Sequence, residues 1–420
     1  MAKRFIKPGI LIMALLLMTL PLLVACGDGG NDKPVPTSTA TAPTKELTIT
    51  IGNHTDITGA SANAVAVINM GLQDLADYFT KEILPGGVKI KVLPYDNQHE
   101  PAKAVPGYRW LKDKGADLIF ACIPDTPPVL KPSVNADKTV LFSSSTLPDI
   151  IDPPGYIFNL GTIPQYEGLT LVKWIAENDW DYKTKGPAKI GGAGWNDGYH
   201  EYLFDGVEAY AKAHPDQFTW VGEYLTDFGF TWGQEVEALK NCDYVIPCAV
   251  MASFVREYRL AGGKGKFIGA GTHSAFLGMM HDAGLWDEMD GMLFLLACKW
   301  WGEEGVLIDL AERLLEENHA DKAESIRKQG SGYAAISNFY AMFDIIAKTV
   351  ESVGPENFNS QTLYETAQTY SLTIEDGVMY SSYSQTKRDA LDAYRIYRVD
   401  GTLKDLIVAD PDWVPVVRNP

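Results

Sequence analysis

Two hydrophobic periods alternate along the first part of the chain. In "ELTITIGN" (residues 46–53) every second side chain is apolar, which predicts a β-strand. Between residues 65 and 79 the apolar side chains recur at spacings of three and four, which predicts one face of a helix. Strands that alternate with helices are typical of a parallel sheet covered by helices on both faces. The same pattern predicts further strands at 88–96, 117–125 and 138–146 and a helix at 101–114.

The alternation restarts in the second part of the chain. A second α/β unit next to the first predicts a cleft between two halves, lined by loops at the carboxyl ends of strands. Amphipathic helices and a strand hairpin follow this unit. The expected elements are helices at 165–178, 199–214, 232–241, 253–263, 305–328 and 333–353, strands at 188–195, 218–225, 243–250 and 266–274, and the hairpin at 384–406.

The N-terminal segment has the pattern of an export signal. A short basic start precedes an apolar run over residues 10–25, which is shorter than the roughly 20 residues of a membrane-spanning helix. The end of the run, "LVAC" at residues 23–26, resembles the lipobox of bacterial lipoproteins. That resemblance implies that residues 1–25 are a signal peptide and that the sulfur of Cys26 carries the lipid. An ordinary signal peptide with a chance cysteine is the alternative.

Residues 26–45 predict a flexible tether. They contain no large apolar side chain except Val35, so they cannot bury enough surface to offset the entropy of ordering. We expect the folded part to begin near Leu47. About 375 residues remain after the tether, which is too many for one small core and indicates two lobes.

Composition and charge narrow the class of protein. The full chain has 46% hydrophobic and 21% charged residues, which is ordinary for a soluble globular protein. Its formal net charge is −18, and removal of Lys3, Arg4 and Lys7 with the signal peptide makes that −21. An acidic surface of this size argues against nucleic acid and against anionic lipid as partners.

The cysteines beyond Cys26 predict core packing rather than chemistry. All four lie in apolar stretches, and none forms a CxxC pair, so a zinc ribbon or a thioredoxin-like site is not expected. Their spacing alone leaves their pairing open. These residues are Cys122, Cys242, Cys248 and Cys298.

The order of motifs resembles one family over residues 46–417. The chain is similar to the ABC-transporter solute-binding proteins of the leucine/isoleucine/valine-binding type, which have the type I periplasmic-binding fold. The motifs that carry the resemblance are "IGNHTDITGASA" (51–62), "VLPYDNQHEPAKAV" (92–105), "LFSSSTLPDI" (141–150), "GWNDGYHEYLFDGV" (194–207), "TWGQEVEALKNCDYVIP" (231–247) and "R-x-A-L-D-A-x-R-x-Y" (388–397).

The resemblance implies an architecture. It implies an α/β fold of two Rossmann-like lobes with parallel central sheets, joined by a hinge that the chain crosses three times. The implied crossings are near 161–166, 297–302 and 370–380. The implied lobes are 46–163 plus 300–372 for lobe 1 and 165–297 plus 376–417 for lobe 2.

The resemblance also implies a site that grips a carboxylate. Hydroxyl and backbone N–H donors of the first lobe hold this group in the family, and a tyrosine closes from the second lobe; a desolvated carboxylate needs several such donors. The serine-rich loop could instead be a helix cap, and the tyrosine could serve packing alone. The matching positions are Ser144, Ser145, Thr146, Asp125, Trp195, Tyr199, Thr272 and Thr58.

Two departures from the family pattern bear on the ligand. Amino-acid binders of the family place an acid after the strand "KFIG", where this chain has Gly271 and Thr272 beside His273. An α-amino acid ligand is therefore in doubt, unless Asp56, Asp125 or Asp197 replaces the acid. A disulfide common in the family is also missing, because His99 stands where the partner of Cys122 would be.

Motifs for other functions are absent or misspaced. The stretch "IGGAGWNDG" has the glycine spacing G-x-G-x-x-x-G, one residue off the dinucleotide fingerprint. No HExxH metal motif and no G-x-S-x-G elbow occurs, and His273 and His281 share no helical face. An enzyme, a metal site and a cofactor are therefore not expected.

The sequence predicts an exported solute-binding lipoprotein of an ABC importer. We expect a lipid-anchored monomer on the outer side of the cytoplasmic membrane, in the periplasm or at the cell surface. It would capture a small amino-acid-like, carboxylate or amide solute by hinge closure and present it to the permease subunits. A sensor that signals to a membrane receptor is the alternative, and a secreted hydrolase is less favoured.

Overall fold

The computed structural model describes residues 46–374 and 377–420. The predicted signal peptide, the tether and Cys26 lie outside the described residues. Within the described part, none of the helices combines the length and the apolar character that a membrane span requires.

The first sheet has five parallel strands in the order β2-β1-β3-β4-β5. Adjacent side chains of the short strand β3 point to opposite faces: Leu118 and Phe120 join one core, and Ile119 and Ala121 join another. Both faces are dry, which explains the continuous apolar run in the sequence. The strands are β1 (Leu47–Thr55), β2 (Val88–Asp96), β3 (Leu118–Ala121), β4 (Leu141–Ser145) and β5 (Ile157–Thr162).

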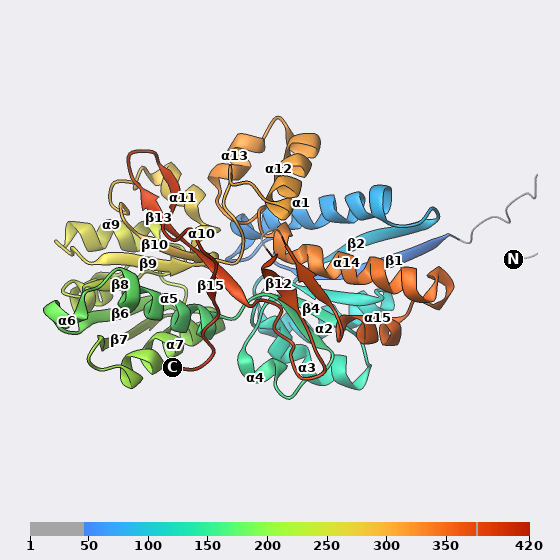
Figure 1. The fold of residues 1–420 in the computed structure, drawn as a ribbon, viewed down its shortest axis with the longest axis horizontal. Coiled ribbons are helices and arrows are strands. Elements are labelled where there is room, and N and C mark those ends of the chain that lie inside the picture. The colour runs from blue at the N-terminus through green and yellow to red at the C-terminus, as the bar shows by residue number, and fades with distance from the viewer. Residues whose placement is uncertain (1–45, 375–376) are drawn as a thin grey trace, which may run out of the picture. The chain divides into compact units, whose positions relative to one another are not determined.

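Helices cover both faces of this sheet (Figure 1). One core contains α1, α12 and α14, and the core on the other face contains α2 and α3. A π-helical turn at Phe79–Ile83 ends α1, and α15 packs on α14. The bounds are α1 (Ala62–Tyr78), α2 (Ala104–Asp113), α3 (Thr126–Ala136), α4 (Pro148–Ile151), α12 (Val306–His319), α13 (Ala323–Lys328), α14 (Ile336–Val353) and α15 (Ser360–Ala367).

The second sheet has a parallel part in the order β7-β6-β8-β9-β10 and an antiparallel extension. The predicted hairpin is confirmed, since β13 and β14 pair antiparallel beside β10. The strands are β6 (Ala188–Trp195), β7 (Phe218–Thr226), β8 (Tyr244–Ile246), β9 (Lys266–Ala270), β10 (Leu293–Leu296), β13 (Ala393–Asp400), β14 (Asp405–Val408) and β15 (Val414–Pro415), with a separate pair of β11 (Ser371–Thr373) and β12 (Met379–Ser382).

The helices between these strands complete the second α/β unit. Helices α5 and α7 pack against each other, and α9 contacts both α8 and α11. The α/β class with two parallel central sheets is as predicted. The bounds are α5 (Pro164–Asn178), α6 (Tyr182–Lys185), α7 (Gly198–Ala213), α8 (Gly233–Leu239), α9 (Ala252–Leu260), α10 (Gly271–Ser274) and α11 (Leu277–Ala283).

Three strand predictions were too long, and the one at 117–125 ends at Ala121. The strand predicted at 243–250 ends at Ile246, because Pro247 has no N–H to donate to the ladder. The strand predicted at 266–274 ends at Ala270, whose N–H bonds Nδ1 of His273 at 3.2 Å and so turns the chain into α10.

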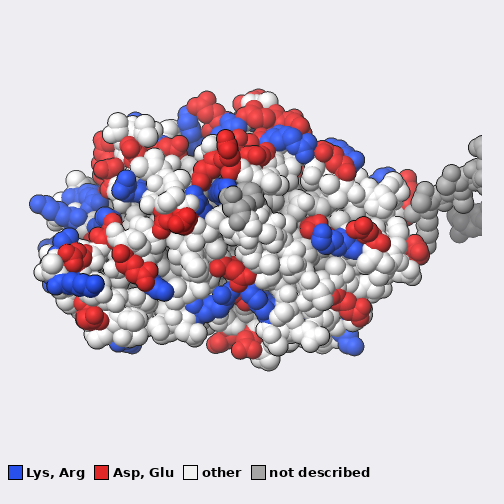
Figure 2. Space-filling model, in the orientation of Figure 1, with Lys and Arg blue, Asp and Glu red and all other residues white. Residues whose placement is uncertain are grey.

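Charged side chains lie in mixed-sign groups on the face that Figure 2 shows. Around α12, a guanidinium nitrogen of Arg313 lies 3.2 Å from a carboxylate oxygen of Glu82, and Arg327 pairs with Glu316 at 2.5 Å. Such exposed pairs contribute at most about 1 kcal/mol each, so the buried cores carry the stability.

Strand β5 was missed because Asn159 interrupts its apolar run. This side chain is fully buried, and each of its polar atoms is bonded. Its Oδ1 accepts a hydrogen bond from Ser143 at 2.9 Å, and its Nδ2 donates to the carbonyls of Gly161 and Thr162 at 2.8 and 3.2 Å. Its backbone N–H donates to Arg388 O, and its carbonyl accepts from the N–H of Ala390. Asn159 therefore joins the end of β5 to the late segment that leads into β13.

Removing this amide should destabilise the protein. In Asn159→Ala, the Ser143 hydroxyl and the carbonyls of Gly161 and Thr162 lose their partner, which predicts a loss of about 2–4 kcal/mol in the free energy of unfolding. Urea denaturation followed by tryptophan fluorescence measures it. Asn178→Ala is the control, because Asn178 is exposed at the end of α5 and should lose less than about 0.5 kcal/mol. Equal losses in both variants would contradict the role of Asn159.

Candidate ligand-binding site

A cavity lies where loops from both sheets meet. It is lined by residues at or just after the carboxyl ends of β3, β4, β5, β6 and β9, together with the start of α1 and residues near α14. Ligands of open α/β sheets bind at this edge of the strands. About 170 Å³ is available to the centres of water molecules. One water needs about 10–15 Å³ by that measure, so roughly ten waters or a small organic molecule would fit.

The cavity brings together most of the residues predicted to contact a ligand. Thr58 is not among them, because its hydroxyl donates to Asp96 at the exposed end of β2 at 2.7 Å. Ser61, three residues further along the same loop, lines the cavity instead. Thr146 is fully buried and also absent from the lining. The predicted residues that do line the cavity are Asp125, Ser144, Ser145, Trp195, Tyr199 and Thr272.

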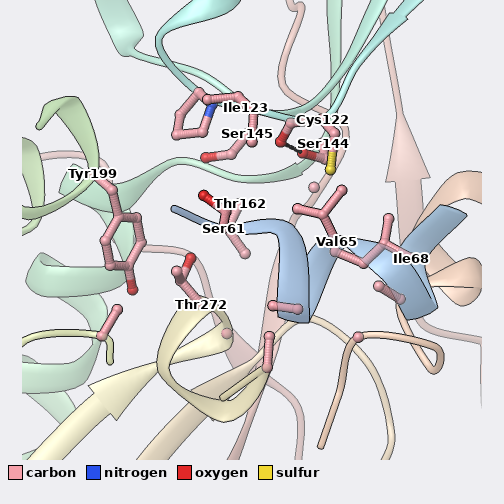
Figure 3. A pocket seen from close by; sticks show the side chains of 18 of the residues that line it. Ser61, Val65, Ile68, Cys122, Ile123, Ser144, Ser145, Thr162, Tyr199 and Thr272 are labelled. Atoms are coloured by element: carbon pink, nitrogen blue, oxygen red, sulfur yellow. Dashed lines mark hydrogen bonds between the residues drawn. The ribbon is translucent and has the colours of Figure 1, made fainter. Parts of the chain in front are cut away.

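The two serines at the end of β4 have different roles. The hydroxyl of Ser144 donates to Cys122 O at 2.6 Å, which ties β4 to the loop after β3. The hydroxyl of Ser145 is buried and has no hydrogen-bond partner among the described residues. Figure 3 shows it at the cavity wall, facing the region between Tyr199 and Thr162. A buried hydroxyl without a partner is unfavourable, so Ser145 is available to bind a polar group of a ligand.

Tyr199 is held in place by a neutral histidine. Nε2 of His273 lies 2.9 Å from Pro247 O and donates to it, which leaves Nδ1 as the acceptor. Nδ1 then accepts from the N–H of Ala270 and from the hydroxyl of Tyr199, both at 3.2 Å. Burial lowers the pKa of His273 to about 3, which keeps the ring neutral. The proton of the Tyr199 hydroxyl is thus engaged, while its oxygen can still accept.

Asp197 caps the helix that carries Tyr199. Its Oδ1 accepts from the backbone N–H of His200 at 2.9 Å and lies 2.7 Å from Nδ1 of the same residue. Nε2 of His200 accepts from the N–H of Ala249 at 3.0 Å. Burial disfavours the charge of Asp197, but His200 outweighs it and lowers the pKa of the carboxyl. This carboxylate is therefore ionised and already paired.

The loop after β3 touches the loop after β6. Oδ1 of Asp125 accepts from the N–H of Gly198, the first residue of α7, at 3.2 Å. Nε2 of His99 lies 3.8 Å from the other oxygen of Asp125. The ring of Phe228 packs 5.8 Å from the His99 ring and 5.1 Å from the Trp195 ring. Groups attached to different sheets thus meet at the rim of the cavity.

The cysteines pack as predicted. The described cysteines are all buried and unpaired, and Cys122 and His99 both line the cavity. Burial raises the pKa of the Cys122 thiol to about 12. The Cys122 thiol is therefore protonated, and the buried cysteines pack as small apolar side chains. The four residues are Cys122, Cys242, Cys248 and Cys298.

Glu167 is a site residue that the sequence did not predict. It lies on α5, is fully buried, and accepts from the N–H of Gly271 at 3.4 Å through Oε1. Its Oε2 has no hydrogen-bond partner among the described residues. Burial raises the pKa of this carboxyl to about 8, so it is protonated at neutral pH. The only sequence signal was that Glu167 lies among the apolar positions of its helix. Such a glutamate is ordinarily taken to extend its carboxylate into solvent.

Much of the lining is apolar. The apolar residues include Val65, Ile68, Leu296, Cys298 and Phe339, and the polar Ser331 and Asn338 also line the cavity. Figure 3 shows Val65 and Ile68 on the side opposite Tyr199. Across the described ranges, no group of three or more His, Cys, Asp or Glu residues could hold a metal ion.

Comparison with known proteins gives a family. The model of the family described as "Periplasmic binding protein" matches residues 48–404. No curated protein sequence matches the chain significantly. Solved structures match over most of their length at low identity, which by itself shows a shared fold.

Three of these structures illustrate the likeness. A branched chain amino acid ABC transporter protein from Thermus thermophilus with bound valine has a TM-score of 0.74 at 16% identity, covering 87% of this chain and 96% of its own. A fatty acid ABC transporter substrate-binding protein from Thermomonospora curvata has a TM-score of 0.70 at 16% identity, and the match covers 88% of this chain and 95% of that protein. A solute binding protein from R. palustris in complex with benzoate has a TM-score of 0.70 at 15% identity, and the match covers 88% of this chain and 97% of that protein.

Glu167 should make the protein less stable as the pH rises. Its pKa is about 8 in the folded protein against an ordinary value of 4.5, so unfolding between these values releases a proton and becomes easier with increasing pH. The loss should approach the order of 4 kcal/mol near pH 8. In Glu167→Gln this contribution should disappear. Melting temperatures from about pH 5 to about pH 9 measure the difference.

Glu177→Gln is the matched control for this experiment. Glu177 lies on the same helix but is exposed, so its removal should leave the slope of the wild type unchanged. A wild-type slope that persists in Glu167→Gln would show that other groups cause it.

Proposed function

The chain belongs to the periplasmic binding protein family, as predicted, and from this premise we propose that it is the solute-binding lipoprotein of an ABC importer. Proteins of this family bind solutes outside the cytoplasm and are not enzymes. The observation that carries the proposal is the cavity, which takes its walls from the loops of both sheets.

Binding at such a site would be coupled to closure. A solute that contacts loops of both sheets is bound more tightly when the sheets approach, so it shifts the equilibrium towards the closed form. The contacts of Asp125 with Gly198 and of His99 with Phe228 are of the kind that closure would form. The closed surface would then be what the permease subunits recognise.

We propose lobes with the predicted boundaries, 46–163 plus 300–372 and 165–297 plus 376–417. The support is that β1–β5 lie in one sheet and β6–β10 with β13–β15 in the other. The chain passes between them after β5, after β10 and before β13, near the predicted crossings.

The proposed ligand is a small solute with a carboxylate or amide group. Ser145 offers a hydroxyl that has no partner among the described residues. Thr272, Tyr199 and Ser144 line the same cavity. The valine and benzoate bound by two of the similar structures share a carboxylate. Asp125 and Trp195 complete the proposed contacts, whereas Thr58 and Thr146 are not among the residues that line the cavity.

Loss of the Ser145 hydroxyl should weaken binding. A charge-assisted hydrogen bond contributes about 1.5–3 kcal/mol, so Ser145→Ala should raise the dissociation constant roughly 10- to 100-fold. Isothermal titration calorimetry with the strongest binder among valine, leucine, benzoate and hexanoate measures it. Ser352→Ala, on the exposed face of α14, is the control. If no solute of any class raises the melting temperature of the wild type, the proposed function fails.

Lipid anchoring rests on Cys26, which lies outside the described residues. We propose that the mature chain begins at Cys26 and works as a lipid-anchored monomer. Two or more acyl chains hold a protein firmly to a bilayer, whereas one holds it marginally. Cys26→Ser should therefore move the exported protein from the membrane fraction to the soluble fraction. Intact-mass spectrometry should show the acyl chains on the wild type alone. A wild type without added mass would exclude the anchor.

A further inference from the structure

The geometry of the cavity points to a narrower ligand class: we infer that it selects a monocarboxylate with an apolar tail and no ammonium group. This inference rests on the proposed function and makes it more specific. It follows from where the polar and apolar side chains lie and from the state of each acid near the cavity.

Polar and apolar groups occupy different parts of the cavity. Figure 3 shows the hydroxyl groups of Ser145, Thr162, Thr272 and Tyr199 around one region, and the hydrocarbon side chains of α1 on the other side. These hydroxyl groups are uncharged, and that of Ser145 has no partner among the described residues. A ligand that matches this arrangement has one polar end and an apolar remainder, since apolar walls favour a desolvated tail.

Hydroxyl groups can hold the carboxylate without a cation. Ser145 has no partner among the described residues and can direct its proton to a carboxylate oxygen. Thr272 lines the cavity as well, and Figure 3 shows its hydroxyl on the same side of the cavity as that of Tyr199. Several such charge-assisted bonds together offset the desolvation of one carboxylate.

An ammonium group would find no free counter-ion. The carboxylates that line the cavity within the described ranges are those of Asp125 and Asp197. Asp197 is bonded twice to His200. Asp125 accepts from Gly198 and faces His99 across 3.8 Å. A ligand ammonium would have to compete with His200 at Asp197 and with His99 at Oδ2 of Asp125.

Glu167, the acid in contact with Gly271, is not available to an ammonium group either. Residue 271 is a glycine, and beneath it the Oε1 atom of Glu167 already accepts the Gly271 N–H. Glu167 does not line the cavity, and its buried carboxyl is protonated at neutral pH because burial raises its pKa to about 8. A buried ammonium without a charged partner is strongly disfavoured. An amino acid should therefore bind more weakly than the same molecule without its amino group.

Matched ligands test the inference on the wild-type protein. Leucine is compared with 4-methylpentanoate and 4-methylpentanamide, and phenylalanine with 3-phenylpropanoate and its amide, by isothermal titration calorimetry. We expect at least one of the acids to bind, about tenfold or more tighter than its amino acid and its amide. An amino acid that binds as tightly as its acid overturns the inference, and so does an amide that binds more tightly.

The two proposals can fail separately. If the matched acids do not bind but another solute class does, and Ser145→Ala weakens it, the inference fails and the proposed function stands. If no solute binds at all, both fail.

A gain of ammonium binding tests the role of position 271. A Cβ atom there would meet only Oε1 of Glu167, at the ordinary contact distance of 3.6 Å. In the double variant Gly271→Asp with Glu167→Gln, the new carboxylate has no like-charged neighbour beneath it. Its preference for 4-methylpentanoate over leucine should fall by about tenfold or more. Gly233→Asp, at the exposed start of α8 with open space around it, is the control. An unchanged preference in a double variant that still binds 4-methylpentanoate would overturn the inference.

Discussion

The fully bonded amide of Asn159 is the interaction on which the arrangement of the cavity depends. The end of β5 is dry, so each polar atom there needs a partner within the protein. Asn159 fixes Ser143, which precedes the cavity serines, and it holds the carbonyls of Gly161 and Thr162, which line the cavity. Its backbone binds the segment that returns the chain to the second sheet. The same buried residue thus stabilises the wall of the cavity through its side chain and the connection to the second sheet through its backbone.

The sequence predicted the fold wherever period and burial agree. Strands buried on both faces appear as apolar runs, as in β3, and the helices show their apolar face. Strand β5 was missed because Asn159 looks like a loop residue until its backbone partners Arg388 and Ala390, more than 200 positions away, are known. In the site, motif resemblance placed Ser145 and Tyr199 in the cavity. Thr58 was misplaced because nothing local shows that its hydroxyl turns to Asp96. The role of Glu167 could not be predicted, because it depends on the tertiary contact between α5 and Gly271.

Two buried acids near the cavity show how local partners decide charge. Asp197 has a histidine and a backbone N–H at its carboxylate, and its pKa is lowered although it is buried. At Glu167, burial raises the pKa and outweighs the opposing effects of the Gly271 N–H and the Thr162 side chain, and Oε2 has no partner among the described residues. The residue type is therefore a poor guide to the electrostatics of the site. What matters for a charged ligand is which carboxylate is both ionised and unengaged.

The buried, unpaired cysteines have a consequence for thiol reactivity. Disulfide formation and exchange proceed through the thiolate, and burial raises the thiol pKa to about 12 at Cys122 and Cys298 and to about 11 at Cys242. At neutral pH these sulfurs are almost wholly protonated and shielded from oxidants. Once folded, the protein therefore exchanges these thiols slowly with external disulfides, and reagents for exposed thiols should reach them only when the chain opens.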